Sequence, residues 1–221
     1  MTGPVPPDPQ YLGSDHDHPD GRDHPDGRIV RGDNRRAAIL DAATREFGRR
    51  GYESARIADI ARAAGVTDAG LLHHFATKRH LFLAVVELRE QVYGPVPDLS
   101  AVTARAAIDG FIATAVRAEQ SPHLLRFRAM LSGATGIEGH PVEGREGQNL
   151  RRGLAVLEPI FAAAVERGEL RAGTDPHQVT LELLALNDGI RSQWAAWPDG
   201  VPYAETFAAA ADALYERIAA K

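Results

Sequence analysis

Apolar side chains recur at intervals of three and four residues along most of this chain, a spacing that places them on one face of an α-helix. Clusters of glycine and proline interrupt the pattern, and each interruption predicts the end of one helix and the start of the next. No run of useful length alternates apolar and polar residues, as a half-buried strand would. The sequence therefore predicts an all-α fold.

Composition divides the chain into three regions. Residues 1–32 are rich in Pro, Gly, Asp and His, repeat the hexapeptide Asp-His-Pro-Asp-Gly-Arg and contain few apolar side chains, which predicts a disordered tail. The three histidines of this tail, interleaved with Asp, leave metal binding as an alternative that the composition favours less. Residues 33–80 are expected to form a small helical domain, and residues 81–221 a larger one.

Capping and stop residues divide the region 33–93 into four predicted helices. These begin at Asp33, Ile57, Thr67 and Thr77, and the first three end at Gly51, Gly65 and Phe75. Further segments are predicted at about 100–131, 142–170, 177–197 and 203–220. Pro122 is expected to divide the first of these segments, and Pro159 to bend the second.

Several classes of protein are excluded or disfavoured by composition. The longest apolar runs have six residues, whereas a membrane-spanning helix needs about twenty. The chain has no cysteine, which excludes disulfides and thiolate zinc sites and is compatible with a cytoplasmic protein. Residues 31–80 carry ten Lys or Arg against six Asp or Glu, whereas the remainder of the chain is acidic. Because nucleic-acid affinity follows local charge, this basic block is where a duplex would bind.

The most informative stretch is Ile57–Phe75, in which two short predicted helices are joined at a glycine. Gly65 can adopt the left-handed conformation that a tight turn requires. Ala61 is small enough for the two helices to cross closely, and Val66 and Leu71 can fill the angle between them. Such a unit presents the N-terminal turn of its second helix to the major groove of DNA, which is ~12 Å wide.

Residues 59–67 have the pattern Asp-Ile-Ala-x-x-Ala-Gly-Val-Thr, and residues 71–78 the pattern Leu-x-x-His-Phe-x-Thr-Lys. Together with Ile-Leu-Asp-Ala-Ala-x-x-x-Phe-x-x-x-Gly before them, these residues resemble the signature of the TetR family. The resemblance covers about Arg36 to Val86. It implies an N-terminal helix-turn-helix DNA-binding domain followed by a helical domain that binds an effector and dimerises.

The resemblance also implies roles for individual residues. It implies phosphate contacts from Thr67, His74 and Lys78, and base-edge contacts from Ala69, Gly70 and His73. The position of Lys78 in the first turn of a helix, where the dipole disfavours a cation, independently favours a phosphate partner.

Four positions depart from the common pattern. Arg56 replaces the usual capping Ser or Thr, so it is expected to add a phosphate contact and to leave Ser54 as a possible cap. Asp68 replaces a common lysine, and it either stabilises the helix N-terminus or accepts a hydrogen bond from a cytosine amino group. Leu72 and His74 stand where tyrosine is frequent. The periodicity assigns Val66, Leu71, Leu72 and Phe75 to the core or to packing contacts.

In the resemblance, the last two helices pair with their copies in a second subunit. Two apolar stripes agree with a homodimer, although both could instead be core within one chain: Leu183, Leu186, Ile190, Trp194 and Trp197, and Phe207, Ala210, Ala211, Leu214 and Ile218. The pocket for a small-molecule effector is expected among polar residues on otherwise apolar segments. These are His123, Arg126, Asn149, Arg152, Asn187 and Gln193.

The sequence thus predicts a cytoplasmic transcriptional regulator that binds a near-palindromic double-stranded operator as a homodimer. We expect a repressor that is released by a small, mostly hydrophobic effector. The alternatives are a ligand-responsive activator and a helical protein-interaction module that does not bind DNA. The chain has no Gly-rich phosphate loop, Gly-x-Ser-x-Gly or His-Glu-x-x-His motif, so no catalytic residue, cofactor or metal site is expected.

Overall fold

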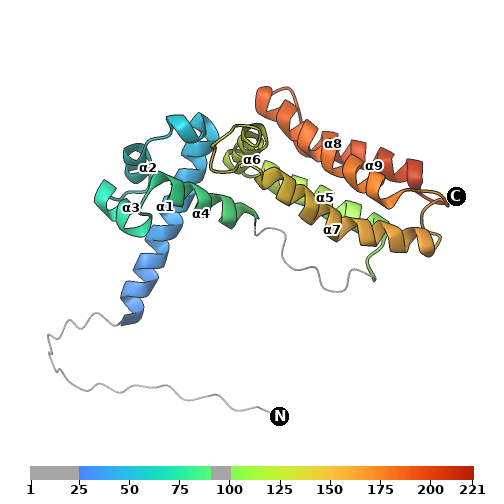
Figure 1. Ribbon diagram of the computed structural model, residues 1–221, viewed down its shortest axis with the longest axis horizontal. Helices are drawn as coiled ribbons and strands as arrows, with labels where there is room; N and C mark the ends of the chain where they lie inside the picture. Colours follow the sequence, from blue (N-terminus) through green and yellow to red (C-terminus); the bar gives the residue numbers. More distant parts are fainter. Residues whose placement is uncertain (1–24, 91–100) are drawn as a thin grey trace, which may run out of the picture.

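The computed structural model describes residues 25–90 and 101–221 of the chain (Figure 1). Within these ranges the regular elements are helices, apart from an isolated bridge between Leu170 and Ala219. They are α1 (Pro25–Ser54), α2 (Ile57–Ala63), α3 (Asp68–His74), α4 (Lys78–Glu90), α5 (Ala104–Glu119), α6 (Pro122–Ala134), α7 (Arg145–Glu166), α8 (Pro176–Ala196) and α9 (Tyr203–Ile218). The all-α prediction is confirmed. No helix within the described ranges is long and apolar enough to span a membrane.

Several predicted helix boundaries are determined by local chemistry. The Thr67 hydroxyl oxygen accepts a hydrogen bond from the Gly70 N–H at 3.0 Å, and the Thr77 hydroxyl oxygen accepts one from the His80 N–H at the same distance. Gly65 has a φ of 68° in the turn between α2 and α3, a conformation in which a side chain would be strained. Both predicted caps and the predicted glycine turn are therefore confirmed.

Two boundaries differ from the prediction. α1 begins at Pro25 rather than at Asp33, and proline suits a first helical position because it has no N–H to leave unsatisfied. The first helix is interrupted at Gly51, whose φ is 73°, as predicted, but helical turns continue after it to Ser54, so Ser54 does not cap α2. Arg56 holds the capping position of α2 without a side-chain hydrogen bond. Residues 1–24 of the predicted tail lie outside the described residues.

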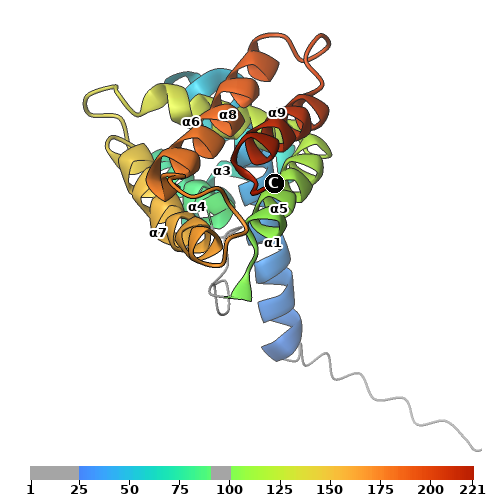
Figure 2. The ribbon, with the colours of Figure 1, turned by 90° about the vertical axis from the view of Figure 1, so that its right-hand side faces the viewer.

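The apolar side chains form two clusters. The first joins α1, α2, α3 and α4 around the edge-to-face pair Phe47 and Phe82, whose ring centroids are 4.9 Å apart. This cluster extends past residue 80 to Val86 and includes Phe127 of α6. The second joins α5, α7, α8 and α9 at the other end of the molecule (Figures 1 and 2). Since α6 contributes Phe127 to the first cluster and Leu125 to the second, it connects the two.

Helices α1 and α6 pack unusually closely at Gly48. A Cβ atom on this glycine would lie 3.0 Å from the carbonyl oxygen of His123 and 3.1 Å from the backbone nitrogen of Phe127. Near this crossing, the Nε2 atom of His123 lies 3.5 Å from a carboxylate oxygen of Asp41. The absence of a side chain at position 48 is therefore what allows the backbones to approach each other.

The loop between α6 and α7 packs a histidine against the first cluster. The His140 ring meets the Tyr52 and Phe82 rings edge-on, with centroid distances of 5.4 and 5.7 Å. Burial lowers the pKa of His140, and the nearby Glu53 carboxylate partly opposes that effect. The loop thus contacts both the end of α1 and the start of α4 through one imidazole.

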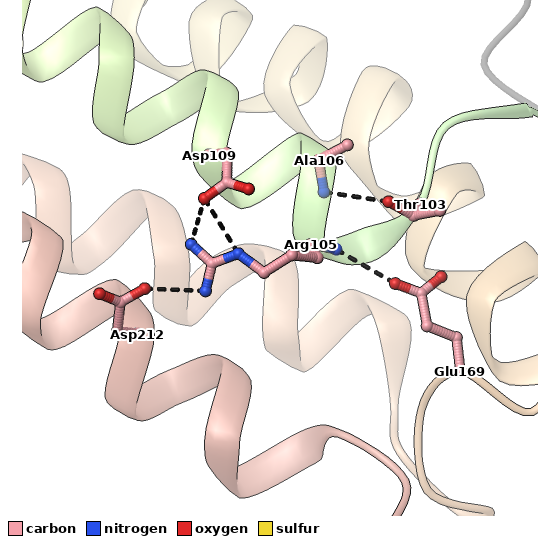
Figure 3. A network of polar contacts seen from close by, with 6 residues as sticks. All are labelled: Thr103, Arg105, Ala106, Asp109, Glu169 and Asp212. Atoms are coloured by element: carbon pink, nitrogen blue, oxygen red, sulfur yellow. Dashed lines mark hydrogen bonds and ion pairs between the residues drawn. The ribbon is translucent and has the colours of Figure 1, made fainter.

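A network of ion pairs and hydrogen bonds joins the start of α5 to two other elements (Figure 3). The Arg105 guanidinium donates to Asp109 of its own helix and, at 2.8 Å, to Asp212 of α9. It also lies over the Tyr215 ring, 5.1 Å from the centroid. The Arg105 backbone N–H donates to the Glu169 carboxylate at 3.1 Å. The hydrogen bond from Arg105 lowers the pKa of Asp109.

Candidate nucleic-acid interface

Helices α2 and α3 form a compact unit around three fully buried side chains. Ile60 and Ala61 of α2 and Leu71 of α3 are inaccessible to solvent. The Val66 N–H donates to the Ala61 carbonyl at 3.0 Å and so closes the turn that contains Gly65. Because Ala61 is small and buried at this crossing, α3 lies close to α2, as the sequence predicts.

The two sides of α3 differ sharply in exposure. Leu71 and Phe75, four residues apart, point into the first cluster, and their predicted core positions are confirmed. The periodicity also assigns Leu72 to packing, but 42% of it is exposed, so that prediction is wrong. In a helix the next residue is turned by about 100°, and α3 has packing neighbours on one side only. Val66, before the helix, is half-buried.

The first turn of α3 is ordered by its own cap. The Thr67 oxygen accepts from the Gly70 N–H, which leaves the hydroxyl proton available for an external acceptor. A Cβ at Gly70 would lie 3.2 Å from that oxygen, so glycine fits this position best. Asp68 and Ala69 are exposed beside it. An acidic residue in this turn stabilises the helix dipole, one of the two roles considered for Asp68.

The two histidines of α3 lie near its C-terminal end. His73 is exposed and His74 is half-buried, and their rings meet edge-on with centroids 5.7 Å apart. Within the part of the chain that the structure describes, no group of three or more His, Cys, Asp or Glu side chains is arranged to hold a metal ion. Both rings are accessible enough to donate or accept hydrogen bonds at the surface of α3.

Lys78 contacts its own chain at the start of α4. Its Nζ atom donates to the carbonyl oxygen of Glu53 at 2.9 Å and lies 4.7 Å from the centroid of the Tyr52 ring. The carbonyl groups at the end of α1 lack helical partners, so a cation is well placed to satisfy one. Lys78 therefore has a structural contact that the sequence did not reveal, and ammonium protons remain for another acceptor.

Arg56 supplies a second cation at this surface. It is exposed at the start of α2, whereas the neighbouring Arg62 donates to Asp59 of the same helix at 3.1 Å. Figure 1 shows α2 and α3 at the end of the molecule remote from α8 and α9. A capped short helix with one bare side and adjacent cations is suited to the major groove of a duplex.

Residues 39–85 match the family model described as bacterial regulatory proteins, tetR family. Over 160 residues the chain is 29% identical to the HTH-type transcriptional regulator AqdR of Rhodococcus erythropolis, covering 71% of this chain and 74% of AqdR. Residues 39–85 thus form a TetR-type helix-turn-helix domain. The chain is a TetR-type helix-turn-helix transcriptional regulator and not an enzyme.

Solved structures agree on the fold of this chain. NalD is the secondary repressor of the MexAB-OprM multidrug efflux pump in Pseudomonas aeruginosa. It matches with a TM-score of 0.65 at 23% identity, over 85% of this chain and 98% of NalD. A complex of SmeT with triclosan matches with a TM-score of 0.68 at 19% identity, over 84% of this chain and 91% of SmeT. SmeT is a repressor of a multidrug efflux pump of Stenotrophomonas maltophilia.

The six residues expected to line an effector pocket make separate contacts in different parts of the chain. His123 pairs with Asp41 of α1, and Arg126 lies over the Trp194 ring. The remaining contacts are hydrogen bonds from Arg152 to Asn149 on α7 and from the Tyr203 hydroxyl to Asn187, while Gln193 borders a groove on α8 and α9. These contacts do not bring the six residues together around one point.

Arg191 is a buried polar residue that the sequence analysis did not select. It is only 6% exposed, and its Nη2 atom donates to Ser132 of α6 at 3.0 Å and to Asp188 at 2.7 Å. The sequence did contain a signal, because Arg191 directly follows Ile190 in the apolar stripe of α8. This guanidinium joins α6 to α8 within the helical domain.

Most residues of the two predicted stripes are buried within this chain, including Leu183, Trp194 and Phe207. Trp197 is instead 65% exposed. An open groove of about 610 Å³ runs between α8 and α9 next to the stripes. Small and apolar side chains line much of it, namely Ala185, Leu186, Gly189, Ala210 and Ala213. Four residues of the predicted stripes also border this groove, namely Leu186, Ile190, Ala210 and Leu214, so the apolar surface left free by the chain's own core overlaps the stripes in part.

Proposed function

We propose that this TetR-family regulator binds a near-palindromic operator as a homodimer, and that it is a repressor released by a small, mostly hydrophobic effector. The observation that carries the proposal is the solvent-exposed side of α3. This helix is capped by Thr67, and the cations Arg56 and Lys78 lie next to it. We assign residues 33–80 to DNA binding and residues 81–221 to effector binding and dimerisation. A cytoplasmic location follows from this role.

The proposed DNA contacts fall into two groups. Arg56, Thr67, His74 and Lys78 would contact phosphates, because each offers a hydrogen-bond donor at the edge of α2, α3 or α4. The base-edge contacts would come from the residues Asp68, Ala69, Gly70 and His73 of α3. This division makes the first group responsible for affinity and the second for sequence preference.

The proposed dimer would use the groove between α8 and α9. Its small residues, among them Gly189 and Ala213, allow the helices of a second copy to approach closely. Two copies related by a two-fold axis would present two α3 helices to the duplex. Each would contact one half-site, about one DNA turn or ~34 Å apart or somewhat more.

Repression and effector release are proposed partly from the structural relatives. NalD and SmeT are both repressors, and SmeT is known in complex with triclosan. We propose that the effector binds within the helical domain, where His123, Arg126, Asn149, Arg152, Asn187 and Gln193 are candidate polar contacts. An activator would use the same operator contacts at a different operator position, and recovery of bound DNA from cells would distinguish the two roles.

The test separates positioning from base preference at the interface. Lys78→Ala should weaken binding to operator and to scrambled duplex about equally. It should also reduce the salt slope by roughly one unit per subunit, about two for the dimer, because each lysine neutralises one phosphate. His73→Ala should cost about 1–3 kcal/mol at the operator and relax preference at particular base pairs. Binding is measured on both duplexes across a salt series, with sedimentation at micromolar concentration to verify the dimer.

Two controls make this test interpretable. Arg117→Ala removes an exposed cation of α5, a helix to which no DNA contact is assigned, and should leave the salt slope unchanged. Because Lys78 also contacts Glu53 and Tyr52, thermal melting must show that each variant is folded at the assay temperature. If Lys78→Ala changes base preference while His73→Ala lowers affinity uniformly, the proposed placement of α3 is wrong.

A further inference from the structure

The solvent side of α3 has an unusual composition for a surface that contacts base pairs. The exposed residues of this helix are Asp68, Ala69, Leu72 and His73. They occur at positions i, i+1, i+4 and i+5, which lie on one side of a helix. The set has no Arg, Lys, Asn or Gln, the side chains that form bidentate hydrogen bonds with guanine or adenine. The base preference of this helix must therefore arise largely from contacts other than bidentate hydrogen bonds.

The largest apolar group on this side is Leu72, of which 42% is exposed. Its neighbour Leu71 already fills the core position and is fully buried, so the packing of α3 does not require Leu72. Ala69 lies one turn before Leu72, and both present methyl groups to the solvent. The two side chains make a short apolar strip between the acidic first turn and His73.

We propose that Leu72 is a specificity-determining residue that contacts the 5-methyl group of a thymine in the major groove. Thymine is the one standard DNA base that presents a methyl group there, and apolar side chains contact it favourably. Gly70, which has no side chain next to this strip, allows the backbone of α3 to approach the bases. The inference rests on the proposed placement of α3 in the groove.

The experiment uses the full-length protein and chemically altered duplexes. A preferred site is first selected from a randomised duplex pool. Each thymine of the site is then replaced in turn by deoxyuridine, which lacks only the methyl group. Burial of one methyl-sized group predicts about a fourfold loss of affinity at one thymine of each half-site. Leu72→Ala should bind the thymine and deoxyuridine forms of that position equally well.

Leu88→Ala is the matched control. Leu88 of α4 is 38% exposed, close to the exposure of Leu72, but it lies outside α3. The Leu88→Ala protein should keep the full response to deoxyuridine. Leu72 is not part of the core, so Leu72→Ala should keep its helices intact. Circular dichroism of both variants verifies this.

The possible results distinguish this inference from the proposed function. Enrichment of a duplex, followed by equal loss of affinity on deoxyuridine substitution in wild type and Leu72→Ala, would refute the role of Leu72 alone. A wild-type protein that tolerates deoxyuridine at every thymine would do the same, as expected if Leu72 is a plain surface residue or contacts another protein. Failure to enrich any duplex would refute the operator-binding proposal and this inference with it.

Discussion

Replacing Gly48 with alanine tests the close packing of α1 on α6. The new Cβ would lie 3.0 Å from the His123 carbonyl oxygen and 3.1 Å from the Phe127 nitrogen. Both are backbone atoms, which cannot rotate away as the end of a side chain can. The contact can be relieved only if one helix moves relative to the other. We therefore expect the strain at this contact to offset or exceed the stability that alanine would otherwise add to α1.

The size of the effect follows from two opposing terms. Removal of glycine from a helix interior stabilises the helix by about 1 kcal/mol. Overpacking of a well-packed contact costs about 1–3 kcal/mol. Gly110 of α5 provides the reference, because its Cβ would have no neighbour within 4 Å. Gly110→Ala should keep only the gain, so the two variants should differ by about 1–3 kcal/mol.

The assay compares thermal melts of the wild-type, Gly48→Ala and Gly110→Ala proteins at one protein concentration. In a chain of this size 1 kcal/mol corresponds to about 2–4 °C in Tm. We expect Gly110→Ala to melt above the wild type and Gly48→Ala to melt below Gly110→Ala by at least that amount. If both alanine variants are equally stabilised, α1 and α6 are not in backbone contact at Gly48, and the inferred connection between the two clusters is wrong.

Two further predictions concern charged groups. Arg105→Met should lower stability by about 1 kcal/mol, because it removes the ion pair with Asp212 that joins α5 to α9. Arg62→Met breaks an ion pair within one helix and should cost only about 0.2–0.5 kcal/mol. Equal changes in Tm would contradict this prediction. Burial lowers the pKa of His140, so the unfolded chain binds more protons than the native chain just below pH 6.5, and stability should fall as the pH decreases through that window. His140→Phe should flatten the Tm–pH curve between pH 7.5 and 5, and parallel curves would exclude the effect.

The fold was predictable because its signals are local. The hydroxyls of Thr67 and Thr77 cap their helices by accepting from N–H groups three residues later in the chain, and Gly65 supplies the positive φ of the turn between α2 and α3. Such signals can be recognised without knowledge of the tertiary structure. The start of α1 was not predicted, because Asp33 and Pro25 are both acceptable first residues and the sequence does not choose between them.

The residues of the candidate interface could be predicted from the sequence, but their exposure and their contacts within the chain could not. Periodicity marks both Leu71 and Leu72 as apolar, and only the direction in which α3 faces shows that Leu72 is exposed. Lys78 lies 25 residues from Glu53 in the chain, so their hydrogen bond leaves no local signal. A stripe such as that of Leu183 and Trp194 is compatible with burial within one chain or between two. Sequence periodicity cannot separate these cases.

The Arg105 network bears on how the length of this chain can change. The side chain holds the start of α5 against α9, and the backbone N–H is held by Glu169. The register of α5 is thus fixed from residue 105 onward by bonds to later parts of the chain. Insertions or deletions before Thr103 need not shift α5 along α9. Relatives that keep an arginine here, with acidic partners equivalent to Asp212 and Glu169, can therefore differ in the length of the segment after α4 and retain the same helical core.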